Sequence, residues 1–151
     1  MDVTLRPRQD TDLVDLLRIW RAAVEATHLF LTHADIDGFS GLVADYLPRM
    51  NDLRVAVDAA NGPLGFIAQV DGKIEMLFVD PAAHGRGIGT LLLEDVGRDF
   101  ATLRLDVNEQ NPTARRFYAA KGFVQVGRSP LDHQGLPFPL LHLERRKPLS
   151  P

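Results

Sequence analysis

Gly85, Gly87 and Gly89 stand at alternate positions in the stretch of this sequence that is best suited to chemistry. Such a run lets backbone N–H groups approach an anion closely, because no side chains stand in the way. An amphipathic segment follows, and the positive end of its helix dipole would lie behind the anion. The spacing predicts a phosphate or pyrophosphate site, with a helix that merely begins with glycines as the simpler alternative.

Two other phosphate-binding loops match less well. A P-loop requires Lys-Ser or Lys-Thr after its last glycine, and Ile88-Gly89-Thr90 provides neither. A dinucleotide-binding loop is the closer rival, because Asp106 stands about 20 residues further on, where an acid for a ribose is expected. The glycines of that motif follow a strand directly, whereas residues 80–84 intervene here. A nicotinamide-dependent oxidoreductase is therefore a distant hypothesis.

A second group of informative residues begins at Asn111. Asn111 can cap a helix whose first residue is Pro112, and Gly122 stands just past the expected end. Tyr118 falls within this helix, and a tyrosine hydroxyl can give its proton to a leaving thiolate. The alternative for Tyr118 is a half-buried aromatic whose hydroxyl only satisfies a neighbour.

Together the two stretches resemble the signatures of the GNAT (Gcn5-related N-acetyltransferase) family. His84-Gly85-Arg86-Gly87-Ile88-Gly89 is similar to its pyrophosphate loop, Q/R-x-x-G-x-G/A, with His84 in place of Gln or Arg. The stretch from Asn111 to Phe123 fills every marked position of N-x-x-A-x-x-F-Y-x-x-x-G-F. The resemblance spans the chain, and residues 26–28 and 137–141 are similar to the YjaB-like branch.

The resemblance implies an enzyme that moves the acetyl group of acetyl-CoA to a primary amine of a small molecule or peptide, by direct attack in a ternary complex. A non-catalytic acyl-CoA-binding or sensing module is the alternative. A backbone N–H near Leu77, on a strand bulge, would polarise the thioester carbonyl. The residues expected to bind the cofactor are Leu77, Phe78, Val79, His84, Gly85, Arg86, Gly87, Ile88, Gly89, Thr90, Asn108, Asn111 and Tyr118.

The attacking amine must lose a proton, and Glu75 is the candidate base. It precedes Leu77 by two residues, so strand alternation predicts that both lie on one face. Its position resembles that of a catalytic glutamate in the family, and the alternative is an ordinary surface carboxylate. His28 is the second candidate base and, with Trp20, a candidate acceptor-binding residue, although Trp20 also suits the core. For His33, His133 and His142 the sequence indicates surface positions.

The elements that must hold these residues form a mixed α/β (α+β) fold. We expect a mostly antiparallel sheet of six to seven strands flanked by about four helices. Asn61-Gly62 and Asp71-Gly72 each suggest a type I′ hairpin turn, and Thr11 or Asp10 can cap the first helix. The expected helices cover residues 12–24, 35–46, 87–100 and 112–121, and the strands 3–5, 54–57, 64–70, 74–79, 103–107, 123–126 and 140–143.

Composition limits the other possibilities. The 151 residues suit a single domain, residues 1–147, with residues 148–151 as a flexible tail. A net charge of −3 argues against nucleic acid as a partner, and no apolar run approaches the roughly 20 residues that span a bilayer. Without cysteine, and with five histidines outside any ligand spacing, we expect no metal. A cytoplasmic enzyme fits these features, and they leave the oligomeric state open.

Overall fold

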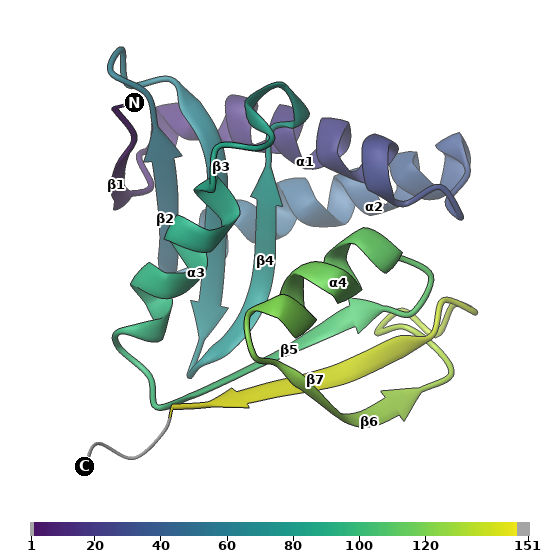
Figure 1. Cartoon of the computed structure of the whole chain (residues 1–151). Coiled ribbons are helices and arrows are strands. Elements are labelled where there is room, and N and C mark those ends of the chain that lie inside the picture. The colour runs from purple at the N-terminus through teal and green to yellow at the C-terminus, as the bar shows by residue number, and fades with distance from the viewer. Residues whose placement is uncertain (1, 148–151) are drawn as a thin grey trace.

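The computed structural model describes residues 2–147, so the predicted tail lies outside the described residues. Seven strands form one sheet in the order β1-β2-β3-β4-β5-β7-β6 (Figure 1). The strands are β1 (Thr4–Pro7), β2 (Asp52–Val57), β3 (Pro63–Val70), β4 (Lys73–Val79), β5 (Thr102–Asn108), β6 (Val124–Ser129) and β7 (Leu140–Arg146). The helices are α1 (Leu13–Thr27), α2 (His33–Tyr46), α3 (Ile88–Gly97) and α4 (Pro112–Ala120). The predicted fold class is confirmed.

The helices cover the sheet from both sides (Figure 1). On one face α1 and α2 bury Leu16, Ile19 and Trp20 against β2 and β3. On the other face α3 and α4 enclose a second core around Leu92 and Leu103. Among residues 2–147, no helix is both long and apolar enough to cross a membrane.

Several helix boundaries differ from the predicted ones, and α1 continues to residue 27 instead of ending at 24. Neither Thr11 nor Asp10 caps α1, because residues 10–12 form a short 3-10 turn and the helix begins after it. The carboxylate of Asp12 holds this turn by accepting from the backbone N–H of Gln9 and from Arg6. Thr32 caps α2, which therefore begins at residue 33. α3 ends at residue 97 and not 100.

The spacing of apolar residues predicts a buried stripe on α3, and this prediction was wrong at Leu91; the predicted stripe comprises Ile88, Leu91, Leu92, Val96 and Phe100. That side chain is 39% exposed, while its neighbour Leu93 is fully buried. Residues 88, 92 and 96 are four apart and fix the inward face of α3. Leu93 lies on the edge of that face toward the sheet, and Leu91 lies on the other edge.

The two glycine turns have different geometry. Asp71 and Gly72 both have positive φ, 50° and 82°, as a type I′ turn requires. At the other turn Asn61 has a φ of 66° but Gly62 has no positive φ, so the type I′ prediction there was wrong. The carboxylate of Asp58 instead accepts from the backbone N–H groups of Ala60 and Gly62 and holds a longer loop.

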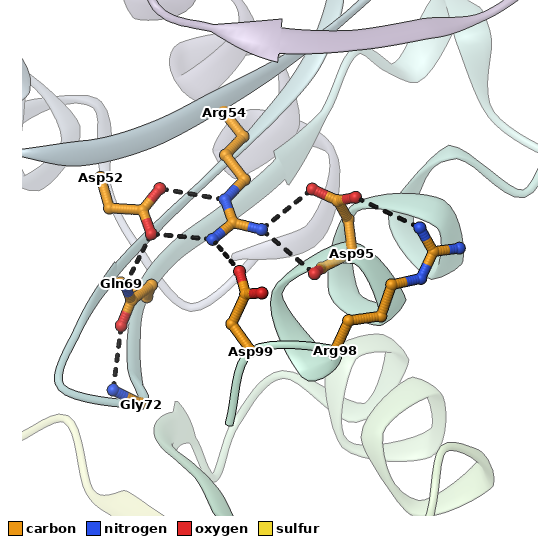
Figure 2. A network of polar contacts seen from close by, with 7 residues as sticks. All are labelled: Asp52, Arg54, Gln69, Gly72, Asp95, Arg98 and Asp99. Atoms are coloured by element: carbon orange, nitrogen blue, oxygen red, sulfur yellow. Dashed lines mark hydrogen bonds and ion pairs between the residues drawn. The ribbon is translucent and has the colours of Figure 1, made fainter. Parts of the chain in front are cut away.

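An arginine cluster fastens α3 to the sheet (Figure 2). Arg54 of β2 pairs with Asp52 at 2.9 Å, with Asp95 of α3 at 2.9 Å and with Asp99 at 2.7 Å. Asp52 also accepts from Gln69, whose own oxygen accepts from the backbone N–H of Gly72. The cluster thus ties α3 to β2 and to the β3–β4 turn.

β4 and β5 are parallel neighbours that pair over a short length. Lys73 lies opposite Arg104 and Ile74 opposite Leu105, and beyond these residues the strands diverge (Figure 1). All other neighbouring strands in the sheet are antiparallel. A sheet with one parallel pair differs from the doubly wound sheet of dinucleotide-binding proteins, so the oxidoreductase hypothesis was wrong.

Candidate active site

The glycine loop and the α4 motif lie side by side in the structure. A side chain at Gly89, in the first turn of α3, would lie 3.4 Å from Cζ of Phe117 on α4 and 3.7 Å from Val79. The small residue at this position lets the two helices approach closely. Two stretches singled out separately in the sequence therefore form one site.

Gly85 and Gly87 provide the open part of this loop. Both have positive φ, 82° and 73°, and a Cβ at either position would meet nothing within 4 Å. Gly87 is the N-cap of α3, and no side chain among residues 2–147 bonds the first turn, so the N–H groups of that turn can bind an anion. The flanking residues His84 and Arg86 are exposed.

The α4 motif is held by its cap and its aromatic side chains. Asn111 is buried, and its side-chain oxygen accepts from the backbone N–H of Ala114 at 3.2 Å, which confirms the predicted cap. Tyr118 is 9% exposed and packs edge-on against Phe117 and Phe123. Burial raises the pKa of Tyr118, so the phenol stays protonated at neutral pH.

The outer half of β4 has a free edge on the side of β5. Residues 77, 78 and 79 lie opposite residues 67, 66 and 65 of β3, and the backbone N–H of Asp80 donates to Leu64 at 2.8 Å. Because hydrogen bonds alternate along an antiparallel pair, Phe78 bonds β3 while Leu77 and Val79 turn their N–H groups toward β5. These amides can hydrogen-bond an extended ligand.

Glu75 occupies a bulge in β4, and this overturns its predicted orientation. Gln69 lies opposite Ile74 and Ala68 opposite Met76, so Glu75 has no partner on β3. Leu77 packs into the α3–α4 core, whereas Glu75 lines a cavity on the α1–α2 side. The two residues therefore do not share a face. The extra residue breaks the alternation that the prediction assumed, and the bulge lies two residues before Leu77.

A cavity of about 590 Å³ opens on the α1–α2 side of β4. Trp20, His28, Glu75 and Asn108 all line it, although Trp20 is 5% exposed and belongs mainly to the core. The wall is otherwise mostly apolar: Val24, Phe30, Leu31, Phe39, Leu42, Val43, Tyr46, Met50, Val70, Met76, Phe78, Phe138 and Leu140, with Lys73, Asp132, His133 and Gln134. An apolar cavity with a few convergent polar groups is typical of a small-ligand site.

His28 is held in a defined protonation state. The Nδ1 of His28 lies 2.8 Å from the hydroxyl of Thr27, and that hydroxyl lies 2.7 Å from the carbonyl oxygen of Ala23. Burial lowers the pKa of His28 to about 4, against a smaller opposing effect of Asn108, so the ring is neutral at pH 7.

A polar cluster that the sequence does not indicate lies beside this cavity. The carboxylate of Asp106 accepts from His142 at 2.6 Å, His133 at 2.9 Å and Lys73 at 3.1 Å. The other ring nitrogen of His142 lies 2.7 Å from the hydroxyl of Ser129. His142 is therefore not a simple surface residue. No three His, Asp or Glu side chains within residues 2–147 are grouped to hold a metal ion.

This geometry agrees with comparisons to known proteins. The family model described as "Acetyltransferase (GNAT) domain" matches residues 43–143. The peptidyl-lysine N-acetyltransferase YjaB of Salmonella typhimurium is 39% identical over 143 residues, 95% of this chain and 98% of that protein. The solution structure of apo YjaB from Escherichia coli superposes with a TM-score of 0.91 at 35% identity, covering 98% of this chain and 100% of that one.

A more distant structure shares the fold alone. PaiA N-acetyltransferase of Thermoplasma acidophilum, solved with coenzyme A, has a TM-score of 0.74 at 18% identity and covers 97% of this chain and 99% of that one. The family match covers the glycine loop, the free edge of β4 and α4, and the YjaB proteins match along nearly the whole chain. The chain thus belongs to the GNAT family and is an N-acetyltransferase.

Proposed function

We propose that this enzyme acetylates the side-chain amine of a lysine in a peptide or protein. The observation that carries the proposal is the position of the cavity. His28 and Glu75 line it on the α1–α2 side, while the glycine loop and Tyr118 lie with α3 and α4. Because β4 and β5 diverge between them, an amine and acetyl-CoA can meet from opposite sides. The relatives' name, peptidyl-lysine N-acetyltransferase, supports lysine as the acceptor.

We infer that acetyl-CoA binds along the α3–α4 side. Its pyrophosphate would meet the N–H groups of Gly85, Gly87 and the first turn of α3. The amides of its pantetheine arm would pair with the free edge of β4 at Leu77 and Val79. The side-chain oxygen of Asn111 is already used by the α4 cap, which leaves its amide N–H groups for the cofactor.

The reaction then follows from the positions of the proposed groups. Nε2 of His28 accepts a hydrogen bond from the lysine amine and orients it, and Glu75 takes the surplus proton, directly or through water. The amine nitrogen attacks the thioester carbon, and a β4 backbone N–H stabilises the oxyanion. The C–S bond then breaks, and Tyr118 gives its proton to the leaving thiolate. The nitrogen releases its remaining surplus proton to water, and Tyr118 takes a proton back from solvent.

The test is acetylation of a short, N-terminally blocked peptide with one lysine. Free CoA and acetyl-lysine should form in equal amounts, and the same peptide with norleucine in place of lysine should release none. Release of CoA without acetyl-lysine, or acetyl-CoA binding with no lysine peptide accepted, would contradict the proposal.

A further inference from the structure

Three phenylalanines from distant parts of the chain form one wall of the cavity. Phe30 comes from the α1–α2 turn, Phe39 from α2 and Phe138 from the β6–β7 loop. The ring centroids of Phe30 and Phe138 are 5.6 Å apart, those of Phe39 and Phe138 6.4 Å, and His28 lies 5.4 Å from Phe30. Each ring is half-buried, so this aromatic wall keeps apolar surface open to an occupant.

The cavity is too large for a lysine side chain alone. Its volume of about 590 Å³ is in the range that holds a drug-sized ligand, whereas lysine offers a four-carbon stem and an ammonium. Apolar surface continues to the rim, where Leu42, Tyr46 and Val70 are 38%, 53% and 50% exposed. A lysine reaching His28 would leave the aromatic wall uncovered.

The charges of the cavity favour a cationic occupant. Its basic side chains Lys73 and His133 are already engaged, because both bond the carboxylate of Asp106. Glu75 makes no ion pair with any residue from 2 to 147, and Asp132 accepts backbone N–H groups at one oxygen. Glu75 is exposed and Asp132 half-buried, and both line a cavity whose wall is otherwise mostly apolar. This combination suits an ammonium attached to a large apolar group.

We propose that the acceptor lysine adjoins an aromatic or large aliphatic residue, and that this neighbour packs on the aromatic wall. The inference rests on the proposed function, since it takes a peptidyl lysine as acceptor and adds a second recognition point. The lysine ammonium lies toward Glu75 and Asp132, and the neighbouring side chain contacts Phe30, Phe39 and Phe138. Selectivity then comes from burial of that neighbour and not from the reaction itself.

The experiment compares blocked peptides that differ in the residue after a single lysine: Phe, Leu, Ser or Asp. Burying a large apolar side chain should raise kcat/KM for the Phe peptide about tenfold or more over the Ser peptide, mainly through KM. The Asp peptide should be the poorest, because Glu75 and Asp132 repel it. A parallel set places these residues before the lysine.

Substitution of the wall identifies its part in this selectivity. Phe138→Ala should bring the Phe-to-Ser ratio of kcat/KM close to one, with the affinity for acetyl-CoA little changed. If Phe138→Ala does not fold, Phe39→Ala is tested in its place. Val126→Ala, which trims an exposed side chain of β6 outside the cavity, should keep the wild-type ratio.

The outcomes separate this inference from the proposed function. Lysine peptides acetylated equally well whatever their neighbours, or a ratio unaffected by both wall variants, would overturn the aromatic subsite alone. If every peptide fails while a free arylalkylamine such as phenethylamine is acetylated, peptidyl lysine is overturned as the acceptor, and the subsite as stated here falls with it.

Discussion

Tyr118 combines two properties that suit the acid role proposed for it. It is nearly buried between Phe117 and Phe123, and burial raises its pKa, so it holds its proton when the reaction begins. An acid for the thiolate must be protonated at that moment. The proton would transfer as the C–S bond breaks, because only then does a sufficiently basic sulfur exist.

Tyr118→Phe should therefore reduce turnover by roughly 100-fold or more, the usual scale of general acid catalysis. The affinity for acetyl-CoA should stay close to wild type, because the ring and its contacts are kept. Steady-state rates with one accepted amine, together with calorimetric titration of acetyl-CoA, measure both quantities. Wild-type turnover would remove Tyr118 from the mechanism.

Glu75→Gln and His28→Gln should give different pH–rate profiles. Without Glu75 the rate should fall most near neutral pH, where the amine is protonated, and the deficit should shrink as pH rises and the amine loses its proton unaided. His28 is neutral throughout this range, so His28→Gln should raise KM by a factor that does not change with pH. A Glu75→Gln profile parallel to wild type would leave that carboxylate without a role in proton transfer.

His28 also links stability to pH. Its pKa of about 4 in the folded protein lies below the ordinary value near 6.5, so the unfolded chain binds the proton more readily. This difference in proton binding does not affect the free energy of unfolding above about pH 6.5, and it destabilises the fold as the pH falls toward 4. His28→Gln should therefore flatten the loss of unfolding free energy between pH 7 and 5 in urea titrations. His33→Gln, at an exposed position of α2, should reproduce the wild-type slope.

At the scale of the element, the start of α3 depends on backbone conformation. Gly87 has a φ of 73°, which β-branched residues strongly disfavour, although the space around it is open. Gly87→Val should therefore displace the free N–H groups of α3 and weaken acetyl-CoA binding by about tenfold or more. Gly135→Val is the matched control, because Gly135 has a φ of 77° and equally open surroundings in the β6–β7 loop. If both variants bind acetyl-CoA like wild type, the glycine loop before α3 does not hold the pyrophosphate.

The far end of α3 depends on Arg54. Arg54→Met would leave the carboxylates of Asp52, Asp95 and Asp99 close together without their cation and should cost about 2 kcal/mol of unfolding free energy. Hydrogen bonds from Arg54 lower the pKa of Asp52, against burial, so their stabilisation is present above its unfolded pKa near 3.9 and lost below it. The difference in unfolding free energy between Arg54→Met and wild type should stay constant from pH 8 to 5 and shrink below pH 4.

Arg98→Met is the control for this cluster. Arg98 is 77% exposed and lies 3.7 Å from Asp95, so its removal should change stability little. Equal destabilisation by the two variants in denaturant titrations would mean that the cluster does not anchor α3.

Considered as a whole, the molecule has a sheet of two parts, β1–β4 and β5–β7, joined at residues 73 and 74 of β4. A cofactor lying between α3, α4 and the edge of β4 would contact both parts. At about 100 times its dissociation constant, acetyl-CoA should raise the melting temperature by roughly 5 °C or more, and NADH and ATP much less. Equal stabilisation by NADH would contradict the proposed cofactor site.

How well the sequence predicted this architecture depended on how local each feature is. The helix that follows the glycine loop and the cap at Asn111 lie within short stretches and were predicted correctly. Glu75 was placed on the wrong face because one unpaired residue in β4 reverses the alternation, and nothing in the sequence marks that residue. His142, Asp106 and Ser129 meet across three strands, so their cluster depends on pairing registers that the sequence does not reveal. The aromatic wall is likewise formed by segments more than a hundred residues apart at its extremes, Phe30 and Phe138.

The divergence of β4 and β5 has a kinetic consequence. If acetyl-CoA binds on the proposed α3–α4 side and the acceptor binds in the cavity on the α1–α2 side, neither molecule would cover the path of the other. Each could enter and leave by its own opening, so no lid is needed to order them. Initial-rate plots against both substrates would then show the intersecting lines of a ternary complex, with either substrate able to bind first. CoA would compete with acetyl-CoA and would leave acceptor binding intact. Because the two substrates would use separate openings, neither has to bind before the other.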